Sequence, residues 1–186
     1  MKKLSLVILI LALVYGLSIA QNSKGNINLG AQLSLLNSVS VSGSGSGNAD
    51  GGLGFVGKAE YMFIDNIGIE ANINYIPVGT DWNTLAFFIG GSYHQPELIK
   101  GFDTFGEILL GMATHTGDIG KEYDGGFSWA AGGGVSYKFM DKLSGLVGYR
   151  YIAFPASWDY NIFGVTGSYS WTLVSSQIYV GINYQL

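Results

Sequence analysis

The sequence predicts an all-β fold, an eight-stranded antiparallel up-and-down β-barrel that crosses a membrane, on the strength of three observations. Large apolar residues alternate with small or polar ones along eight stretches, which is the period of a strand with two different faces. Only 12% of the residues are charged, whereas soluble domains carry about 25%. An apolar segment of the kind that directs export precedes the first stretch.

The first twenty residues have the pattern of a secretory signal peptide. Lys2 and Lys3 form a positive start, residues 4–17 are almost all apolar, and Ser18 and Ala20 supply the small residues of a cleavage site. The apolar run is shorter than the roughly 20 residues that a membrane-spanning helix needs. We therefore expect 1–20 to be removed and 21–186 to form one outer-membrane barrel domain.

Charge and cysteine content exclude several classes of protein. The formal net charge of the whole chain is −4, and removal of the two lysines makes it more negative, so we expect no nucleic-acid partner. The chain has no cysteine, so an exported protein of this sequence holds its fold without disulfides. No apolar run of about 18 residues follows the signal segment, which excludes a helical membrane protein.

The first four strands are predicted at 25–36, 55–63, 67–75 and 85–93, each with one apolar face. Ile64-Asp65-Asn66 is a short turn between the second and third, and Pro77 ends the third. The Ser/Gly-rich stretch 38–52 and the stretch 77–83 are expected to be loops. The residues predicted to face lipid are Ile27, Leu29, Ala31, Leu33, Leu35; Phe55, Gly57, Ala59, Tyr61, Phe63; Ile67, Ile69, Ala71, Ile73, Tyr75; and Leu85, Phe87, Ile89, Gly91, Tyr93.

The last four strands are predicted at 102–112, 127–139, 143–151 and 176–186 by the same alternation. Met140-Asp141-Lys142 is a tight turn, and 94–101, 115–126 and 153–175 are expected to be connections, with 163–173 as a candidate extension of the wall above the membrane. Long and short connections therefore alternate, which is typical of outer-membrane barrels with short periplasmic turns. Aromatic residues near the strand ends fit two interfacial girdles, of which Tyr75, Trp82, Phe127, Trp129 and Tyr151 would form the outer one.

The opposite arrangement, a soluble barrel with its apolar face inside, is the alternative. About forty large side chains would then have to fit an eight-stranded lumen, which has little space. The outside would consist largely of Gly, Ala, Ser and Asn, so we favour lipid as the outer solvent.

Six charged residues fall on the small, polar face and would point into the lumen. A turn centred on Asp65 places Glu60 opposite Glu70, and adjacent carboxylates repel unless cations lie between them. An eight-stranded interior is just wide enough to be filled by side chains, so we expect a structural salt-bridge network that plugs the lumen. A polar pathway for ions is the alternative. The network residues are Lys58, Glu60, Glu70, Glu107, Lys138 and Arg150.

Catalytic and metal sites are not predicted. Glu60 and Glu70 could suggest acid/base catalysis, but no substrate would reach them inside a narrow barrel. His115 is the only candidate for a lipid A-modifying enzyme and has no His-x-Ser spacing, so a surface-loop histidine is expected there, and His94 is expected in a periplasmic connection. The acidic stretch 118–124 matches no EF-hand spacing, and no metal or other cofactor is expected.

The hairpin around the Met140 turn carries a family resemblance. The segment Ala131-Gly-Gly-Gly-Val-Ser-Tyr-Lys-Phe139, followed by Leu146-Val-Gly-Tyr-Arg-Tyr151, resembles the penultimate hairpin of small OmpA/OmpX-like and opacity-type "porin family" outer-membrane barrels. Members of this family usually end in Phe or Trp, whereas this chain ends in Tyr184-Gln185-Leu186. Recognition by the barrel-insertion machinery would then rest on Tyr184 or on a lineage-specific signal.

The sequence therefore predicts a monomeric integral protein of the bacterial outer membrane that is not an enzyme. Its partners would be outer-membrane lipid, the insertion machinery and an extracellular ligand bound through the loops, above all 38–52 and 153–175. The first alternative is a small porin-like channel for ions or small solutes, and the second is a lipid A-modifying enzyme.

Overall fold

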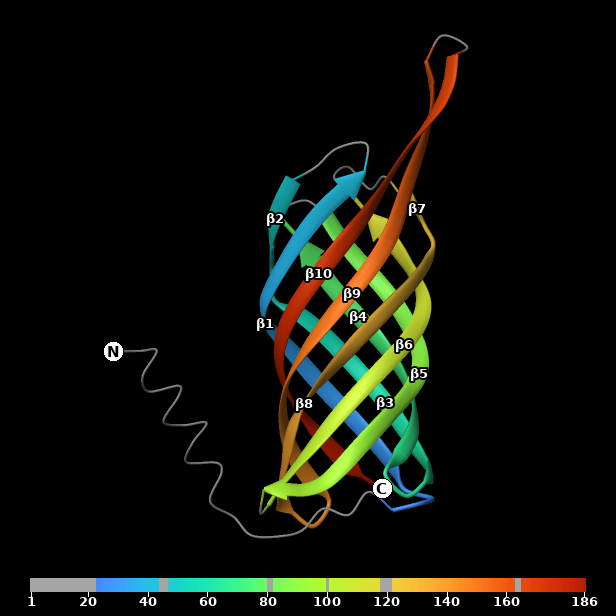
Figure 1. Ribbon diagram of the computed structural model, residues 1–186. Coiled ribbons are helices and arrows are strands. Elements are labelled where there is room, and N and C mark those ends of the chain that lie inside the picture. The colour runs from blue at the N-terminus through green and yellow to red at the C-terminus, as the bar shows by residue number, and fades with distance from the viewer. Residues whose placement is uncertain (1–22, 44–46, 80–81, 100, 118–121, 163–164) are drawn as a thin grey trace, which may run out of the picture.

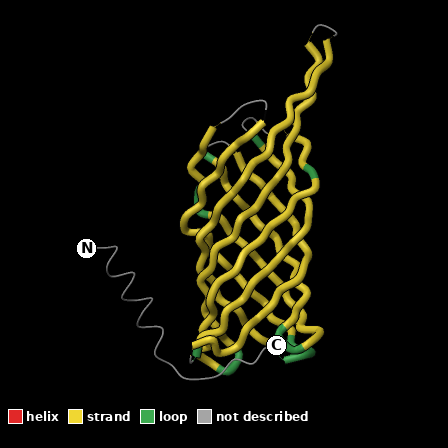
Figure 2. Tube along the Cα trace, viewed as in Figure 1, coloured by secondary structure: helices red, strands yellow, loops and turns green. Residues whose placement is uncertain are grey.

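The computed structural model describes residues 23–43, 47–79, 82–99, 101–117, 122–162 and 165–186, and all regular structure in them is β-strand (Figures 1 and 2). The predicted signal peptide lies outside the described residues. No helix in the described part of the chain is long and apolar enough to span a bilayer. The strands are β1 (Ile27–Gly43), β2 (Gly47–Gly51), β3 (Gly54–Ile64), β4 (Ile67–Val78), β5 (Trp82–Ile99), β6 (Phe102–Thr116), β7 (Glu122–Gly125), β8 (Phe127–Met140), β9 (Leu143–Ile162) and β10 (Val165–Gln185).

These strands form one closed antiparallel sheet. The strands pair antiparallel around the ring, and β10 pairs back onto β1 from Asn28–Gln185 to Gly43–Trp171, which closes it. β2 and β3 both pair with β1 and β4, and β7 and β8 both pair with β6 and β9. Each of these two pairs is one strand of the wall with a break in it. The described residues therefore form eight wall strands, which confirms the predicted fold.

The two breaks have the same construction on opposite sides of the barrel. Gly52 lies between β2 and β3 beside Pro77, and Gly126 lies between β7 and β8 beside Pro155; a Cβ on either glycine would come within 2.9 to 3.0 Å of the proline Cγ. Three residues of the broken strand face two residues of its neighbour at each site. Each break is thus a β-bulge opposite a proline, which lacks the amide that a regular ladder would use.

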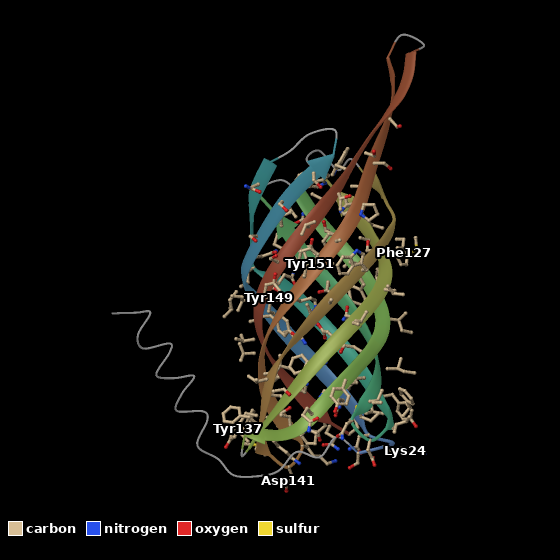
Figure 3. All side chains as sticks on the ribbon, in the orientation of Figure 1. Lys24, Phe127, Tyr137, Asp141, Tyr149 and Tyr151 are labelled. Atoms are coloured by element: carbon tan, nitrogen blue, oxygen red, sulfur yellow. The ribbon has the colours of Figure 1, made fainter. Side chains whose placement is uncertain are left out.

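The outer face of the lower two-thirds of the barrel is apolar. Ile89 is 61% exposed, Ile108 69% and Ile182 53%, and soluble proteins do not present such residues as a continuous belt. Aromatic residues border the belt. Figure 3 shows Tyr137 at the end that also holds Lys24 and Asp141, and Phe127 and Tyr151 higher on the wall. This surface is the one predicted to contact lipid.

The connections β3–β4 and β8–β9 lie at the lower end of Figure 1, where β5 also ends and β6 begins. The C-terminus lies at the same end, and the Leu186 amide donates to the Ile27 carbonyl oxygen at 2.9 Å. Short turns and the C-terminus mark the periplasmic end of an outer-membrane barrel. The opposite end is therefore extracellular.

The prediction of long extracellular loops is wrong for the described residues, and 44–46, 80–81, 118–121 and 163–164 lie outside them. Residues 38–43 and 47–51 are strand, as are 77–78, 82–83, 115–116, 122–125 and most of 153–175. The reason is that backbone groups above the lipid still gain from pairing with a neighbouring strand, and Ser/Gly-rich composition weakens a strand without forbidding it. Only the expected wall extension within 163–173 agrees, for residues 165–173.

The pattern of apolar residues inverts where the wall leaves the membrane. Along β1, Leu29 and Leu33 face out, but above a bulge between Ser34 and Leu36 the buried residue is Val39, while Ser38 and Ser40 are exposed. The outer solvent there is water, so apolar side chains turn into the lumen. Trp82 follows the same rule: it packs against the luminal core, which corrects its assignment to the outer girdle.

Candidate functional site

The lower part of the lumen holds a buried layer of ion pairs. Lys58 Nζ lies 2.9 Å from Glu70 Oε2, and Arg150 Nε lies 2.6 Å from Glu107 Oε1. Arg150 also donates to Asn74 Oδ1 at 3.2 Å and places Nη2 3.9 Å from Glu70 Oε1. Arg150 and Glu70 are fully inaccessible to solvent. Four of the six predicted network residues therefore form one connected cluster.

Glu60 joins this layer through partners that the sequence analysis did not identify. It pairs directly with Glu70 in the register of β3 and β4, as predicted. Its carboxylate accepts hydrogen bonds from Asn28 Nδ2 at 3.0 Å, from Ser92 Oγ, and from His94 Nε2 at 2.7 Å. Polar donors from two other strands, β1 and β5, thus stabilise a carboxylate that is 1% exposed.

Lys138 is the predicted network residue that the structure places elsewhere. It lines a cavity of about 30 Å³ at the periplasmic mouth, together with Asn28, His94 and Asp103. A space of this size holds about one water molecule. Lys138 therefore belongs to the periplasmic mouth.

His94 is a luminal residue, so its predicted place in a periplasmic connection is wrong. β5 continues to Ile99, and His94 is 4% exposed, with its ring 6.0 Å from that of Phe105. The alternation of faces along β5 predicts the inward position of His94, because Tyr93 faces outward and the next residue of the strand must face inward. The predicted connection 94–101 therefore begins too early in the chain.

An apolar layer closes the lumen above the ion pairs. Its centre is formed by Phe88, Leu109, Ile152 and Phe154, each less than 5% exposed. Trp82 and Trp171 pack on it from the extracellular side, with ring centroids 5.9 Å apart. The lumen is therefore filled by two successive layers of side chains, one charged and one apolar.

His115 lies in the apolar layer and is 1% exposed, so the prediction of a surface-loop histidine is wrong. The Thr84 hydroxyl donates to Nδ1 at 2.9 Å, and Nε2 donates to the Pro155 carbonyl oxygen at 3.2 Å. A carbonyl oxygen can only accept, which fixes the proton of the neutral ring on Nε2. The flanking Thr114 and Thr116 are the first polar outward residues above Met112, so this part of β6 lies outside the lipid belt.

Stability should depend on pH through His115. Burial lowers the pKa of the His115 imidazole below its usual value, so the folded state binds this proton less well than the unfolded state does. As pH falls from about 7 to about 5, the unfolded state gains a proton and the fold loses stability. We expect the urea midpoint in lipid vesicles to fall more over this range in the wild type than in His115→Gln. Parallel curves for the two proteins would contradict the assignment.

The strongest feature of the extracellular end is a two-stranded ribbon formed by β9 and β10 (Figure 1). These strands stay paired up to Ile162–Val165. Among the described pairings, β7 pairs β9 only as far as Ser157, and β1 pairs β10 only as far as Trp171. Beyond these points β9 and β10 pair only with each other, well above the rest of the wall.

The described residues contain no cluster of three or more His, Cys, Asp or Glu side chains placed to hold a metal ion. His115, the one candidate for lipid A chemistry, is bonded to Thr84 and Pro155 inside the lumen rather than on the lipid-facing side. This geometry gives it no access to a lipid substrate.

The chain is similar to known proteins in structure but not in sequence. No family model matches the chain, and no curated protein matches it in sequence. The solved structure of Neisserial surface protein A is similar, with a TM-score of 0.64, 13% identity, and coverage of 88% of this chain and 100% of that one.

Two further outer-membrane proteins show the same likeness. AlkL in lipid bilayers has a TM-score of 0.58 and 15% identity, covering 92% of this chain and 95% of that one. OprG from Pseudomonas aeruginosa has a TM-score of 0.53 and 15% identity, covering 91% and 99%. These likenesses confirm that the chain has the fold of the small, OmpA/OmpX-like outer-membrane β-barrels.

Proposed function

We propose that this protein is a non-conducting outer-membrane barrel that binds an external ligand through the strands that rise above the membrane. The observation that carries the proposal is the contrast between the two ends of the wall. Below, a charged layer and an apolar layer of buried side chains cross the lumen, which supports a closed interior. Above, β9 and β10 continue as an isolated ribbon.

The ribbon has no role in closing the barrel. The ring of strands is complete at the level of Gly43–Trp171 and Asp124–Ser157, so the residues above add exposed backbone without adding to the luminal core. Exposed loops and extensions on a rigid scaffold are where binding residues concentrate. The similar structure of Neisserial surface protein A belongs to a protein whose name describes it as a surface protein.

Shortening the ribbon should abolish binding and leave the barrel intact. Ser157 pairs with Ser170, so residues 158–169 can be replaced by Asn-Gly, a two-residue hairpin turn. The wild type and this shortened variant, both in lipid nanodiscs, would be probed with a random-peptide phage library and a glycan array. We expect ligands that bind the wild type and not the shortened variant.

Folding of the shortened variant is checked by its heat-modifiable migration in SDS gels. Probes that bind both proteins equally, or a wild type that enriches no probe from either collection, would overturn the proposed function.

A further inference from the structure

We propose that the periplasmic mouth of the lumen binds an ethanolamine phosphate group, in which a short linker joins a primary ammonium to a phosphate. The inference does not depend on the extracellular ribbon. It follows from two unsatisfied acceptor atoms at a cavity of water size, from the negative charge around that cavity, and from two lysines where it meets a larger one.

The inner cavity is the one of about 30 Å³ that is lined by Asn28, His94, Asp103 and Asn183, among others. His94 Nε2 donates to the Glu60 carboxylate at 2.7 Å, so Nδ1 of the neutral ring is a hydrogen-bond acceptor. Among the described residues, neither this buried Nδ1 nor the buried Asn183 Oδ1 has a hydrogen-bond partner. An unpaired buried acceptor is costly. The two atoms therefore favour a ligand that donates hydrogen bonds.

The charge around the inner cavity favours a donor that is also a cation. Asp103 lines the cavity and is 4% exposed, and the Glu60 carboxylate lies on the other side of the His94 ring. A space for about one water molecule admits an –NH₃⁺ group, which carries three N–H donors. A trimethylammonium group is too large for this space and has no N–H to donate. The inner cavity is therefore suited to a primary ammonium.

A larger cavity of about 420 Å³ adjoins the inner one at the periplasmic end of the barrel. Lys138 and Lys142 line both cavities, so two cations lie where the cavities meet. Ser23 and Asn26 add a hydroxyl and an amide to the larger cavity, and Asp141, which is labelled in Figure 3, adds a carboxylate. Lysines together with hydroxyl and amide donors are suited to a phosphate. A ligand with its ammonium in the inner cavity would place its phosphate beside the lysines.

An ethanolamine phosphate group has these two charges in this order. It can come from the headgroup of a phosphatidylethanolamine in the surrounding membrane or from a soluble molecule. The chemistry recognised is the same in both cases, and the experiment separates the two sources.

The test titrates soluble O-phosphoethanolamine against the mature chain in phosphatidylcholine nanodiscs, with phosphocholine as the matched control. Nitrogen NMR of the His94 imidazole reports the binding, and the spectrum of His115→Gln assigns the His94 signal. We expect O-phosphoethanolamine to shift the Nδ1 signal and to bind about tenfold more tightly than phosphocholine, which cannot donate to Nδ1.

Three variants locate the site. Asn183→Leu removes one acceptor and should weaken binding about tenfold. Lys142→Met removes one cation of the larger cavity and should weaken it about threefold, since this lysine is exposed. Lys24→Met changes an exposed lysine at the same end that is not among the residues lining either cavity, and it should leave binding unchanged.

Replacing part of the nanodisc lipid with phosphatidylethanolamine identifies the source. Competition with the soluble ligand assigns the site to a membrane headgroup, and unchanged binding assigns it to a soluble molecule. The variant with the shortened ribbon should bind as the wild type does, which keeps this result separate from the surface function. Equal binding of O-phosphoethanolamine and phosphocholine, a His94 signal that does not shift, or an affinity unchanged in both Asn183→Leu and Lys142→Met would overturn the proposal.

Discussion

Replacing Arg150 with methionine should destabilise the barrel by about 3 to 5 kcal/mol, the cost of leaving a buried charge without its partner. Methionine occupies much of the volume of the arginine stem but gives Glu107 no cation and Asn74 Oδ1 no donor. It also removes the guanidinium that lies 4.9 Å from the centre of the Tyr179 ring. Urea unfolding in lipid vesicles, followed by tryptophan fluorescence, measures the effect.

Two further variants separate the ion pair from general damage. In the double variant Arg150→Met with Glu107→Gln the unpaired charge is gone, so most of the lost stability should return. Lys142→Met removes an exposed lysine at the periplasmic turn and should change stability by less than about 0.5 kcal/mol. A single Arg150→Met variant with the wild-type midpoint would show that the layer is not a stabilising network.

The mature wild-type protein, from Gln21, should pass no discrete current in planar bilayers. A conducting path would have to cross both the layer around Arg150 and Glu107 and the apolar layer around Phe154 and Leu109, and both are almost inaccessible to solvent. Reproducible single-channel steps from folded wild type would contradict the filled lumen and support the porin-like alternative.

A positive control comes from opening both layers together. Arg150→Ser with Glu107→Ser empties the charged layer, and Phe88→Ser with Phe154→Ser empties the apolar one. A variant with all four changes should conduct if it folds, whereas either pair alone should stay silent because the other layer still closes the lumen. This pattern distinguishes two barriers in series from a single gate.

The membrane-facing half of the fold could be predicted from the sequence because lipid imposes one rule on every strand. Residues such as Ile69, Ile89 and Ile182 must face out where they contact hydrocarbon, so their period gives the strand and its outward face together. The pairing of Glu60 with Glu70 followed from the Asp65 turn alone.

The extracellular half escaped prediction because the rule changes there. Val39 and Phe154 are apolar and point inward. The rule that apolar strand residues face outward does not fit them, so the segments that contain them were predicted as loops. The bulge at Ser34–Leu36 also shifts the parity of β1, and no local signal marks it. The prediction for His115 is wrong for the same reason, since its partners Thr84 and Pro155 lie just outside the predicted strands 85–93 and 143–151.

The charged layer also acts on the route to the folded state. A neighbouring strand that slips by two residues keeps every apolar side chain toward lipid, so the bilayer itself does not oppose the error. The same slip along the barrel moves Arg150 by two positions from the level of Glu107, since both residues lie beside Gly132, and leaves ions in a low-dielectric interior at a cost of several kcal/mol each. We therefore expect the buried ion pairs to favour the native register over registers shifted by two residues, a difference that contact with lipid does not provide.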